Sequence, residues 1–320
     1  MKGIISTIVK IGISGAILYF LFRSINMAAF LKTVMSINPL YVVLAALVFL
    51  GTQCISTYRW KVILKKDMEV PYFRLFSIYF IGMFFNNFLP SMVGGDIIKG
   101  YYLYRHSKRG DVTMASIFMD RYSGFTALMS ITAVTLFFGY DIIKGTTLPA
   151  FFVLLIGGFV SMSLIIWVSF LHNWVMLLLS KIHFYGINQK IDTFYRVLMG
   201  YKREYAVLWK IYFCSLLIQG GVIIGYYIIG TGLGMNLRPV YYFLFIPLTT
   251  AVSMLPISLA GLGIREGAFV FLFTRAGAST EQALTLSLMW FVITAIVSLI
   301  GGVEYVRMGG KGYSAEERPS

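Results

Sequence analysis

Six ionisable side chains lie in otherwise apolar parts of this sequence, as three pairs of opposite charge. The pairs are Asp96 with Lys99, Asp120 with Arg121, and Arg265 with Glu266. A charge inside a bilayer costs about 2.5–3.5 kcal/mol on insertion scales unless it is paired or hydrated. Such pairs therefore indicate either a polar ligand site at membrane depth or ion pairs that join helices.

The spacing within the pairs differs, and the cations suit a particular ligand. Asp96 and Lys99 are three residues apart and share one helical face, so they can pair locally. Asp120 and Arg121 are adjacent and point about 100° apart on a helix, so each needs a partner elsewhere. Arginine forks and helix N-termini bind phosphate well, which favours an anionic ligand. Neutral polar groups in the apolar stretches are Asn86, Asn87 and Gln219.

The composition defines the environment in which these side chains must be held. Of 320 residues, 58% are apolar, 17% aromatic and 12% charged. A soluble domain carries about 25% charged residues, so a soluble globular protein, a disordered chain and a disulfide scaffold are excluded. A polytopic α-helical membrane protein remains. The net charge of +14 then indicates basic loops on the cytoplasmic side rather than nucleic-acid binding.

Apolar windows of about 20 residues predict the spanning helices. Six spans are expected, within 3–22, 33–58, 122–140, 145–180, 211–237 and 282–303. The first is interpreted as a membrane helix rather than a signal peptide, because Lys10 interrupts it.

The distribution of Lys and Arg predicts orientation. Eighteen of the 27 fall on one side of the predicted spans, five on the other, and four inside apolar stretches. The side with eighteen should be cytoplasmic, which puts both termini inside. Residues 309–320 are polar and are expected to form a disordered cytoplasmic tail.

Two apolar windows return to the side from which they started. Residues 72–104 begin and end on the basic side, and residues 240–278 begin and end on the charge-poor side. Each turns at a Leu-Pro-x4-Gly segment, which predicts two re-entrant hairpins. The expected hairpin breaks are Pro90, Gly94, Gly95, Pro256, Gly261 and Gly263. The alternative is two ordinary Pro-kinked helices with external loops.

The two hairpins define an internal repeat. Each is the third element in a set of helix, helix, hairpin and helix, over about 1–140 and about 145–306. The two hairpins are expected to enter the membrane from opposite sides, which makes the repeat an inverted one. Matched Gly/Pro breaks in two halves of a chain indicate the midplane site of a transporter. We therefore predict an all-α polytopic membrane protein. One transmembrane domain, 1–308, should hold about six spanning helices and two re-entrant hairpins.

Catalytic and cofactor motifs are missing from the sequence. It contains no GxxxxGK[ST], GxSxG or HExxH segment, and the three histidines match no metal spacing. We expect no enzymatic activity, no cofactor and no metal.

Four segments together resemble one known family. They are Tyr-Arg-Trp at 58–60, the Leu-Pro and Gly-Gly-Asp-x2-Lys-Gly elements within 89–100, Asp-Arg-x2-Gly at 120–124, and PxxxxGxGxREG at 256–267. Over roughly 5–306 the chain resembles the lysylphosphatidylglycerol synthase transmembrane-region family, also called the flippase-like integral membrane domain. Lys99 stands where many members carry Arg, which keeps the charge but not the planar fork.

The resemblance implies a lipid transporter. Such a flippase would move a phosphate-containing lipid (an aminoacyl-phospholipid, a glycolipid or a polyprenyl-phosphate-linked sugar) between leaflets of the cell membrane, with a lipid-modifying enzyme as a possible partner. The family's transferase domain is not found in these 320 residues, so synthase activity is not expected. The candidate substrate-binding residues are Arg59, Asp96, Lys99, Asp120, Arg121, Arg265 and Glu266. Arg59 is included because it belongs to the segments that carry the resemblance. The alternatives are an intramembrane transferase acting on lipid headgroups and a non-transporting scaffold.

Overall fold

The computed structural model describes residues 27–88, 94–168, 197–253 and 261–310, with single positions at 19, 23, 170 and 195. Every regular element in these ranges is a helix. The helices of the first half are α2 (Met27–Ser36), α3 (Pro39–Leu64), α4 (Tyr72–Phe88), α5 (Gly94–Ser107) and α6 (Gly110–Ile143). Those that follow are α7 (Leu148–Trp167), η1 (Tyr201–Arg203), α10 (Tyr205–Gly232), α11 (Pro239–Ser253), α12 (Ile264–Arg275) and α13 (Thr280–Gly310).

Five of the described helices are long and apolar enough to cross a bilayer. They are α3, α6, α7, α10 and α13, and they coincide with five of the six predicted spans. The predicted all-α polytopic membrane class is therefore confirmed. The sixth predicted span, 3–22, lies outside the described residues apart from Tyr19. Residues 89–93 and 254–260 of the two hairpin turns and residues 311–320 also lie outside them.

The predicted span 33–58 covers a boundary between two helices, because it contains the end of α2 and most of α3. Helix α2 ends at Ser36, and α3 begins at Pro39. The Asn38 side chain accepts a hydrogen bond of 2.9 Å from the Leu40 amide, and proline at the first helical position has no amide hydrogen to leave unpaired. The break follows from Asn-Pro, a signal that hydropathy alone does not register.

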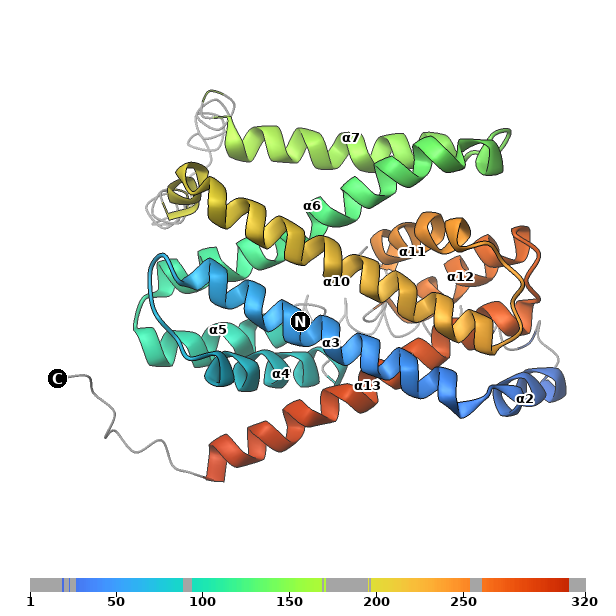
Figure 1. Ribbon diagram of the computed structural model, residues 1–320, viewed down its shortest axis with the longest axis horizontal. Coiled ribbons are helices and arrows are strands. Elements are labelled where there is room, and N and C mark those ends of the chain that lie inside the picture. Colours follow the sequence, from blue (N-terminus) through green and yellow to red (C-terminus); the bar gives the residue numbers. More distant parts are fainter. Residues whose placement is uncertain are drawn as a thin grey trace, which may run out of the picture.

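The helices of both predicted hairpins are too short to span the bilayer. They contain 17 and 14 residues in α4 and α5, and 15 and 12 in α11 and α12. At 1.5 Å per residue they extend roughly 18–26 Å, less than the ~30 Å of hydrocarbon. Figure 1 shows α4 and α5 side by side in one half of the molecule and α11 and α12 in the other, each pair starting from its own end.

Helix packing is reciprocal between the two halves of the chain. Helices α3 and α10, each preceding a hairpin, pack along one another across the middle of the molecule (Figure 1). The first hairpin packs through α4 on α13, the last helix of the second half, and the second packs through α11 on α6, the last helix of the first. Each hairpin thus rests on the opposite half, as expected for an inverted repeat.

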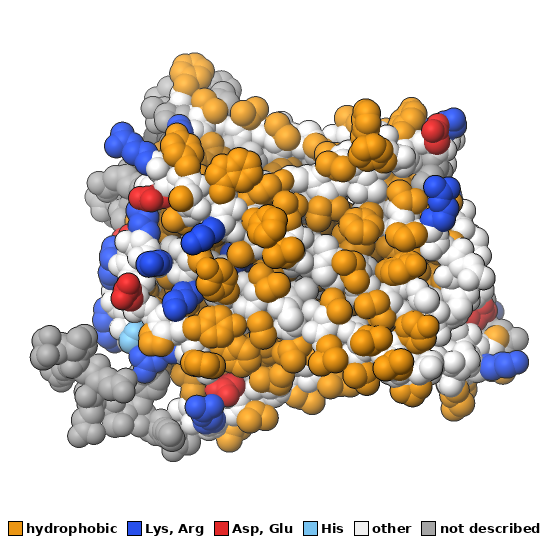
Figure 2. Space-filling view, in the orientation of Figure 1, with side chains coloured by type: hydrophobic (Ala, Val, Ile, Leu, Met, Phe, Trp, Pro, Cys, Tyr) orange, Lys and Arg blue, Asp and Glu red, His pale blue; other side chains and the backbone are white. Residues whose placement is uncertain are grey.

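Basic side chains gather at one end of the molecule. Figure 2 shows Lys and Arg concentrated there and an apolar band across the middle of the visible face. This end holds the junctions of α3 with α4 and of α5 with α6, and the start of α10. Tyr201 anchors it by donating a hydrogen bond of 3.0 Å to the Ile63 carbonyl oxygen, and burial raises the pKa of this hydroxyl.

Candidate functional site

Five charged side chains from three helices of the first half form one connected network. Arg59 comes from α3, Asp96 and Lys99 from the first turns of α5, and Asp120 and Arg121 from α6. Four of them are buried or nearly so, which at membrane depth requires each charge to have a partner.

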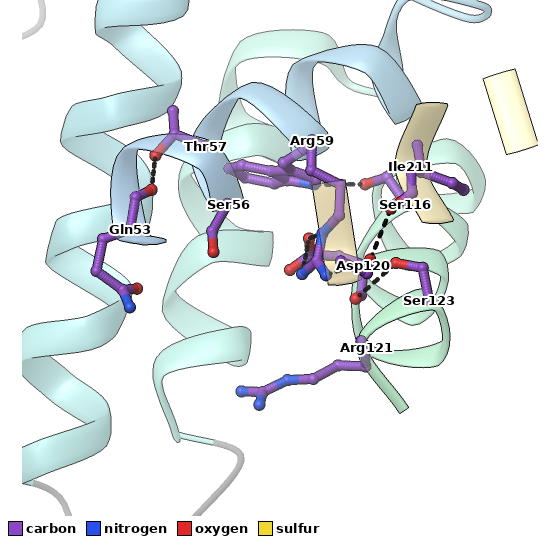
Figure 3. Close-up of polar contacts among 12 residues, drawn as sticks. Gln53, Ser56, Thr57, Arg59, Ser116, Asp120, Arg121, Ser123 and Ile211 are labelled. Carbon is purple, nitrogen blue, oxygen red and sulfur yellow. Dashed lines mark hydrogen bonds and ion pairs between the residues drawn. The ribbon is translucent and has the colours of Figure 1, made fainter. Parts of the chain in front are cut away.

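Asp120 is the centre of this network. Its Oδ1 accepts hydrogen bonds from Arg59 Nε at 3.0 Å and from the second arm of the same guanidinium at 2.8 Å. The remaining arm of Arg59 donates to Ser215 Oγ on α10 at 2.8 Å. Figure 3 shows Arg59 pointing towards Asp120 from the neighbouring helix. Arg59 is one of the eighteen basic residues that the charge count placed on the cytoplasmic side. It is 5% exposed and belongs to the interior of the protein.

Lys99 links the two carboxylates. Its Nζ lies 3.3 Å from Asp120 Oδ2 and 3.6 Å from Asp96 Oδ1. The same ammonium lies 4.3 Å from the ring centroid of Tyr79 and 5.0 Å from that of Trp60, so two aromatic faces share its charge. Two carboxylates and two aromatic rings thus hold Lys99 within the network.

Arg121 is the most accessible of the three cations in the network. Its Nε donates to Asp96 Oδ2 at 2.8 Å, yet 43% of its side chain is exposed. Figure 3 shows it extending away from Asp120. Asp96 in turn keeps one buried oxygen, Oδ1, that accepts no hydrogen bond within the described part of the chain. The pair Asp96–Arg121 is therefore the incompletely bonded edge of the network.

The network borders a cavity of about 250 Å³ and leaves it positively charged. All five ionised residues line this cavity, together with neutral polar groups that include Gln53, Asn86, Gln219 and Thr250. Three cations face two carboxylates, so one positive charge has no counter-charge in the network. A single negative charge brought into the cavity would balance it.

The third pair forms a separate, internally neutral unit at the start of α12. Arg265 donates to Glu266 Oε1 from Nε at 2.9 Å and from its terminal nitrogen at 2.5 Å. Glu266 is fully buried, and its other oxygen accepts the Gly263 amide at 2.7 Å, which caps the helix. Ser287 bonds to both members of the pair. Glu266 thus anchors Arg265 and is itself fully buried.

Arg265 borders a second cavity, of about 240 Å³, next to the first. Its other walls are aromatic rings, hydroxyls and amides, among them Tyr226, Trp290 and Asn87. Asn86 and Thr250 line both cavities, so the two share a wall. The three predicted pairs therefore do not meet in one cavity: two pairs border the first, and Arg265 borders its neighbour.

The predicted hairpin breaks fall into three groups. Pro90 and Pro256 lie outside the described residues. Gly261 and Gly263 have φ of +80° and +84°, a conformation that L side chains adopt at a cost. Gly94 and Gly95 are the first two residues of α5. A Cβ on Gly95 would overlap the Gly82 carbonyl oxygen of α4, so this glycine permits close helix packing.

Several residues of the site carry no charge, and sequence reasoning did not single them out. They are Ser215, Tyr79, Thr250 and Ser287. Trp60, by contrast, belongs to the Tyr-Arg-Trp segment of the family resemblance. A usable signal existed for Ser215, which stands four residues before Gln219 and therefore on the same face of α10. No comparable spacing marks the aromatic residues, because rings are common throughout an apolar chain.

Comparison with known proteins gives the family. The sequence model of one protein family, the lysylphosphatidylglycerol synthase TM region, matches residues 7–302 of this chain. The chain belongs to this family. The match covers all three helices that supply the charge network and both hairpins, as the resemblance implied.

Relatives of this lysylphosphatidylglycerol synthase TM-region protein occur in archaea. A UPF0104 membrane protein of Methanothermobacter thermautotrophicus is 24% identical over 293 residues, covering 78% of this chain and 79% of its own length. A UPF0104 membrane protein of Pyrococcus horikoshii is 23% identical over 304 residues, covering 85% and 88%. These names state that the relatives are membrane proteins, and this chain is likewise an integral multi-pass membrane protein.

Proposed function

We propose that this protein transports a phosphate-containing lipid between the two leaflets of the cell membrane. The observation that carries the proposal is the unbalanced positive charge at the first cavity, presented by Arg121. A buried network with three cations and two acids is poorly balanced until an anion joins it. A lipid phosphate supplies that anion and fits the guanidinium fork of Arg121.

Asp96 gives the site a means of receiving and releasing the phosphate. Its carboxylate bonds to Arg121 at 2.8 Å and approaches Lys99 at 3.6 Å, so it can stay paired with Lys99 when a phosphate takes its place on Arg121. A phosphate cannot cross about 30 Å of hydrocarbon without polar partners. This cavity, which lies between the candidate spanning helices α3, α6 and α10, offers such partners.

The architecture also supports transport. Two short hairpins start from opposite ends of the molecule, and each packs on the other half of the chain. Inverted repeats of this kind allow alternating access around a central site. We further propose that the basic end is cytoplasmic, that both termini are inside, and that the chain has no enzymatic role.

Lipid movement in sealed vesicles tests the proposal. The purified protein is reconstituted with fluorescent phosphatidylglycerol, and dithionite quenching reports the fraction that changes leaflet. Arg121→Ala should slow the movement about tenfold or more, since it removes charged hydrogen bonds, while Arg121→Lys should keep part of the rate.

The matched control is Arg307→Ala. Arg307 is also an arginine paired with a carboxylate, Glu304, but its side chain is 68% exposed and lines neither cavity. Its loss should leave the rate unchanged. Equal rates for Arg121→Ala and the wild type would contradict the proposal. A new lipid product in the mass spectrum of the vesicles would indicate an intramembrane transferase instead.

A further inference from the structure

We propose that the second cavity binds the uncharged, hydroxyl-bearing part of a lipid headgroup whose phosphate occupies the first cavity. The ligand class is a phosphodiester lipid that carries a glycerol or a sugar beyond its phosphate. The inference rests on the proposed function and narrows it to a substrate class. Four observations carry it: the hydrogen-bonding state of the wall, the absence of a carboxylate from the described residues of that wall, the charge balance of the two cavities, and their shared wall.

The four Ser and Thr hydroxyl groups that line the second cavity present acceptors. Thr249, Thr250, Ser253 and Thr294 line it, and each donates its single hydroxyl hydrogen to a carbonyl oxygen of its own helix, at distances of 2.6–2.9 Å. A hydroxyl whose hydrogen is engaged offers only lone pairs to a ligand. Four neighbouring acceptors need a ligand rich in donors.

The side-chain amides of Asn86 and Asn87 each have one group that is already hydrogen-bonded and one that can bind a ligand. Asn87 donates through Nδ2 to the Thr294 carbonyl oxygen at 3.3 Å, which leaves Oδ1 as a further acceptor. Asn86 accepts the Gly95 amide on Oδ1 at 2.8 Å, which leaves its NH2 group as a donor on the wall between the cavities. The second cavity thus presents acceptors for hydroxyl groups beside the guanidinium of Arg265, and Asn86 adds a donor on the wall shared with the first cavity.

The donor that these acceptors need is a hydroxyl rather than an ammonium. Among the described residues no carboxylate lines the second cavity, since Glu266 is fully buried with both oxygens bonded. Arg265 lines it and repels a second cation. The remaining wall is aromatic, from Tyr226, Phe269, Trp290 and Phe291, and suits the carbon skeleton of a sugar or a glycerol.

The charge balance limits the ligand to one negative charge. Four cations border the two cavities, and three acids pair with them. The cations are Arg59, Lys99, Arg121 and Arg265, and the acids are Asp96, Asp120 and the buried Glu266. A phosphodiester neutralises the remaining charge. A diphosphate would leave an excess negative charge in a low-dielectric site, which is costly.

The shared wall makes two-point binding possible. Asn86 and Thr250 belong to both cavities, so a headgroup can extend from one to the other past these two side chains. Asn86 stands on α4 of the first hairpin and Thr250 on α11 of the second. A headgroup at this junction would contact both hairpins.

Competition among matched lipids, followed by native mass spectrometry of the full chain, tests the inference. Phosphatidylglycerol and phosphatidylmethanol have the same single charge and differ in the hydroxylated glycerol. Phosphatidylglycerol should bind about tenfold more tightly, the effect of one or two net hydrogen bonds. A polyprenyl phosphohexose is compared in the same way with polyprenyl methyl phosphate. The larger of the two preferences distinguishes a sugar from a glycerol headgroup, and either one supports the inference.

Variants then locate the preference. Ser253→Ala with Thr294→Val removes two acceptors of the second cavity and should reduce the preference about tenfold while leaving phosphatidylmethanol binding unchanged. The matched control, Ser298→Ala with Thr274→Val, removes two hydroxyls that also bond to their own helices but line neither cavity. It should retain the wild-type preference.

Three results would overturn the inference, and one of them also reaches the proposed function. Equal binding of phosphatidylglycerol and phosphatidylmethanol, both above diacylglycerol, would reject the hydroxyl site and leave the transporter proposal standing. Tighter binding of lysyl-phosphatidylglycerol than of phosphatidylglycerol would show that the site accepts a cation. Binding of no phosphodiester above diacylglycerol would reject both proposals.

Discussion

At the residue scale, the stability of the charge network depends on Asp120. Its carboxylate bonds to Arg59 and to Lys99, which are 5% and 4% exposed. Without it, two buried cations lose their shared counter-charge, and leaving buried charge unpaired costs about 3–5 kcal/mol. We expect Asp120→Ala to lower the free energy of unfolding by about that amount, measured by unfolding of the purified protein in detergent.

Two further variants separate this effect from a general loss of charge. Arg59→Leu with Asp120→Leu removes one cation and one acid together, leaves the surplus charge as it was, and should recover much of the loss. Asp141→Ala breaks an exposed pair with Lys144 and should cost less than about 1 kcal/mol. If Asp120→Ala and Asp141→Ala were equally stable, Asp120 would not be the centre of a buried network.

Sequence spacing predicted part of this network and could not predict the rest. The local pair of Asp96 and Lys99 is present, at 3.6 Å. The 100° between Asp120 and Arg121 required distant partners, and Asp120 pairs with Arg59 and Lys99 while Arg121 pairs with Asp96. The identity of Arg59 as a partner depends on how α3 packs against α6. No local pattern carries that information across 61 residues.

At the element scale, Gly95 determines how closely the two helices of the first hairpin approach. A Cβ at this position would overlap the Gly82 carbonyl oxygen and lie 2.6 Å from Asn86 Cγ. We therefore expect Gly95→Ala to force α5 away from α4 and to lower the melting temperature. The same shift would move Asp96 from Arg121, so lipid binding measured by native mass spectrometry should weaken as well.

Gly51→Ala is the matched control for this substitution. Gly51 also stands within a helix, α3, but nothing lies within 4 Å of its Cβ position. Alanine is the better helix former by about 0.5–1 kcal/mol, so this variant should be as stable as the wild type or slightly more so. A Gly95→Ala protein that behaved like Gly51→Ala would show that α4 and α5 pack less closely than described.

The elements themselves were readable from the sequence, because a span must be long and apolar, but their ends were less so. Hydropathy predicted all five of the candidate spans found among the described residues. It merged α2 with α3, whose boundary is set by the Asn38 cap and Pro39. The glycines of the first hairpin were interpreted as a break, and α5 does begin at Gly94. Gly95 also serves packing, a role that depends on the backbone of another helix.

At the scale of the whole molecule, the sequence predicted an inverted repeat but did not predict the division of the site. Matched Leu-Pro-x4-Gly breaks and the charge count both indicate two hairpins of opposite entry. The arrangement in which each hairpin packs on the last helix of the other half follows from three-dimensional packing. The same packing separates Arg265 from the charge network and gives two adjoining cavities, where the three charged pairs alone indicated one.

The opposite entry of the hairpins leads to a prediction about labelling from the two sides of the membrane. With Cys54 and Cys214 replaced by Ser, single cysteines are introduced at Glu69 and Ser107, which flank the first hairpin. Others are introduced at Asn236 and Ser279, which flank the second. The hairpin helices are shorter than the bilayer is thick, so the members of each pair should react from the same side. The first pair lies at the basic end and should react from the cytoplasm, and the second from outside.

If the two cysteines of a pair reacted from opposite sides, the segment between them would cross the membrane and would not be a re-entrant hairpin. For the first hairpin, this would place the ends of α4 and α5 on different sides of the membrane. The close contact of Gly82 with Gly95 and the bond of Asn86 to the Gly95 amide require the two helices to run back along one another. Labelling of all four positions from one side would instead keep both hairpins and reject their inverted relation. The two halves could then not exchange roles to expose one central site alternately to each leaflet.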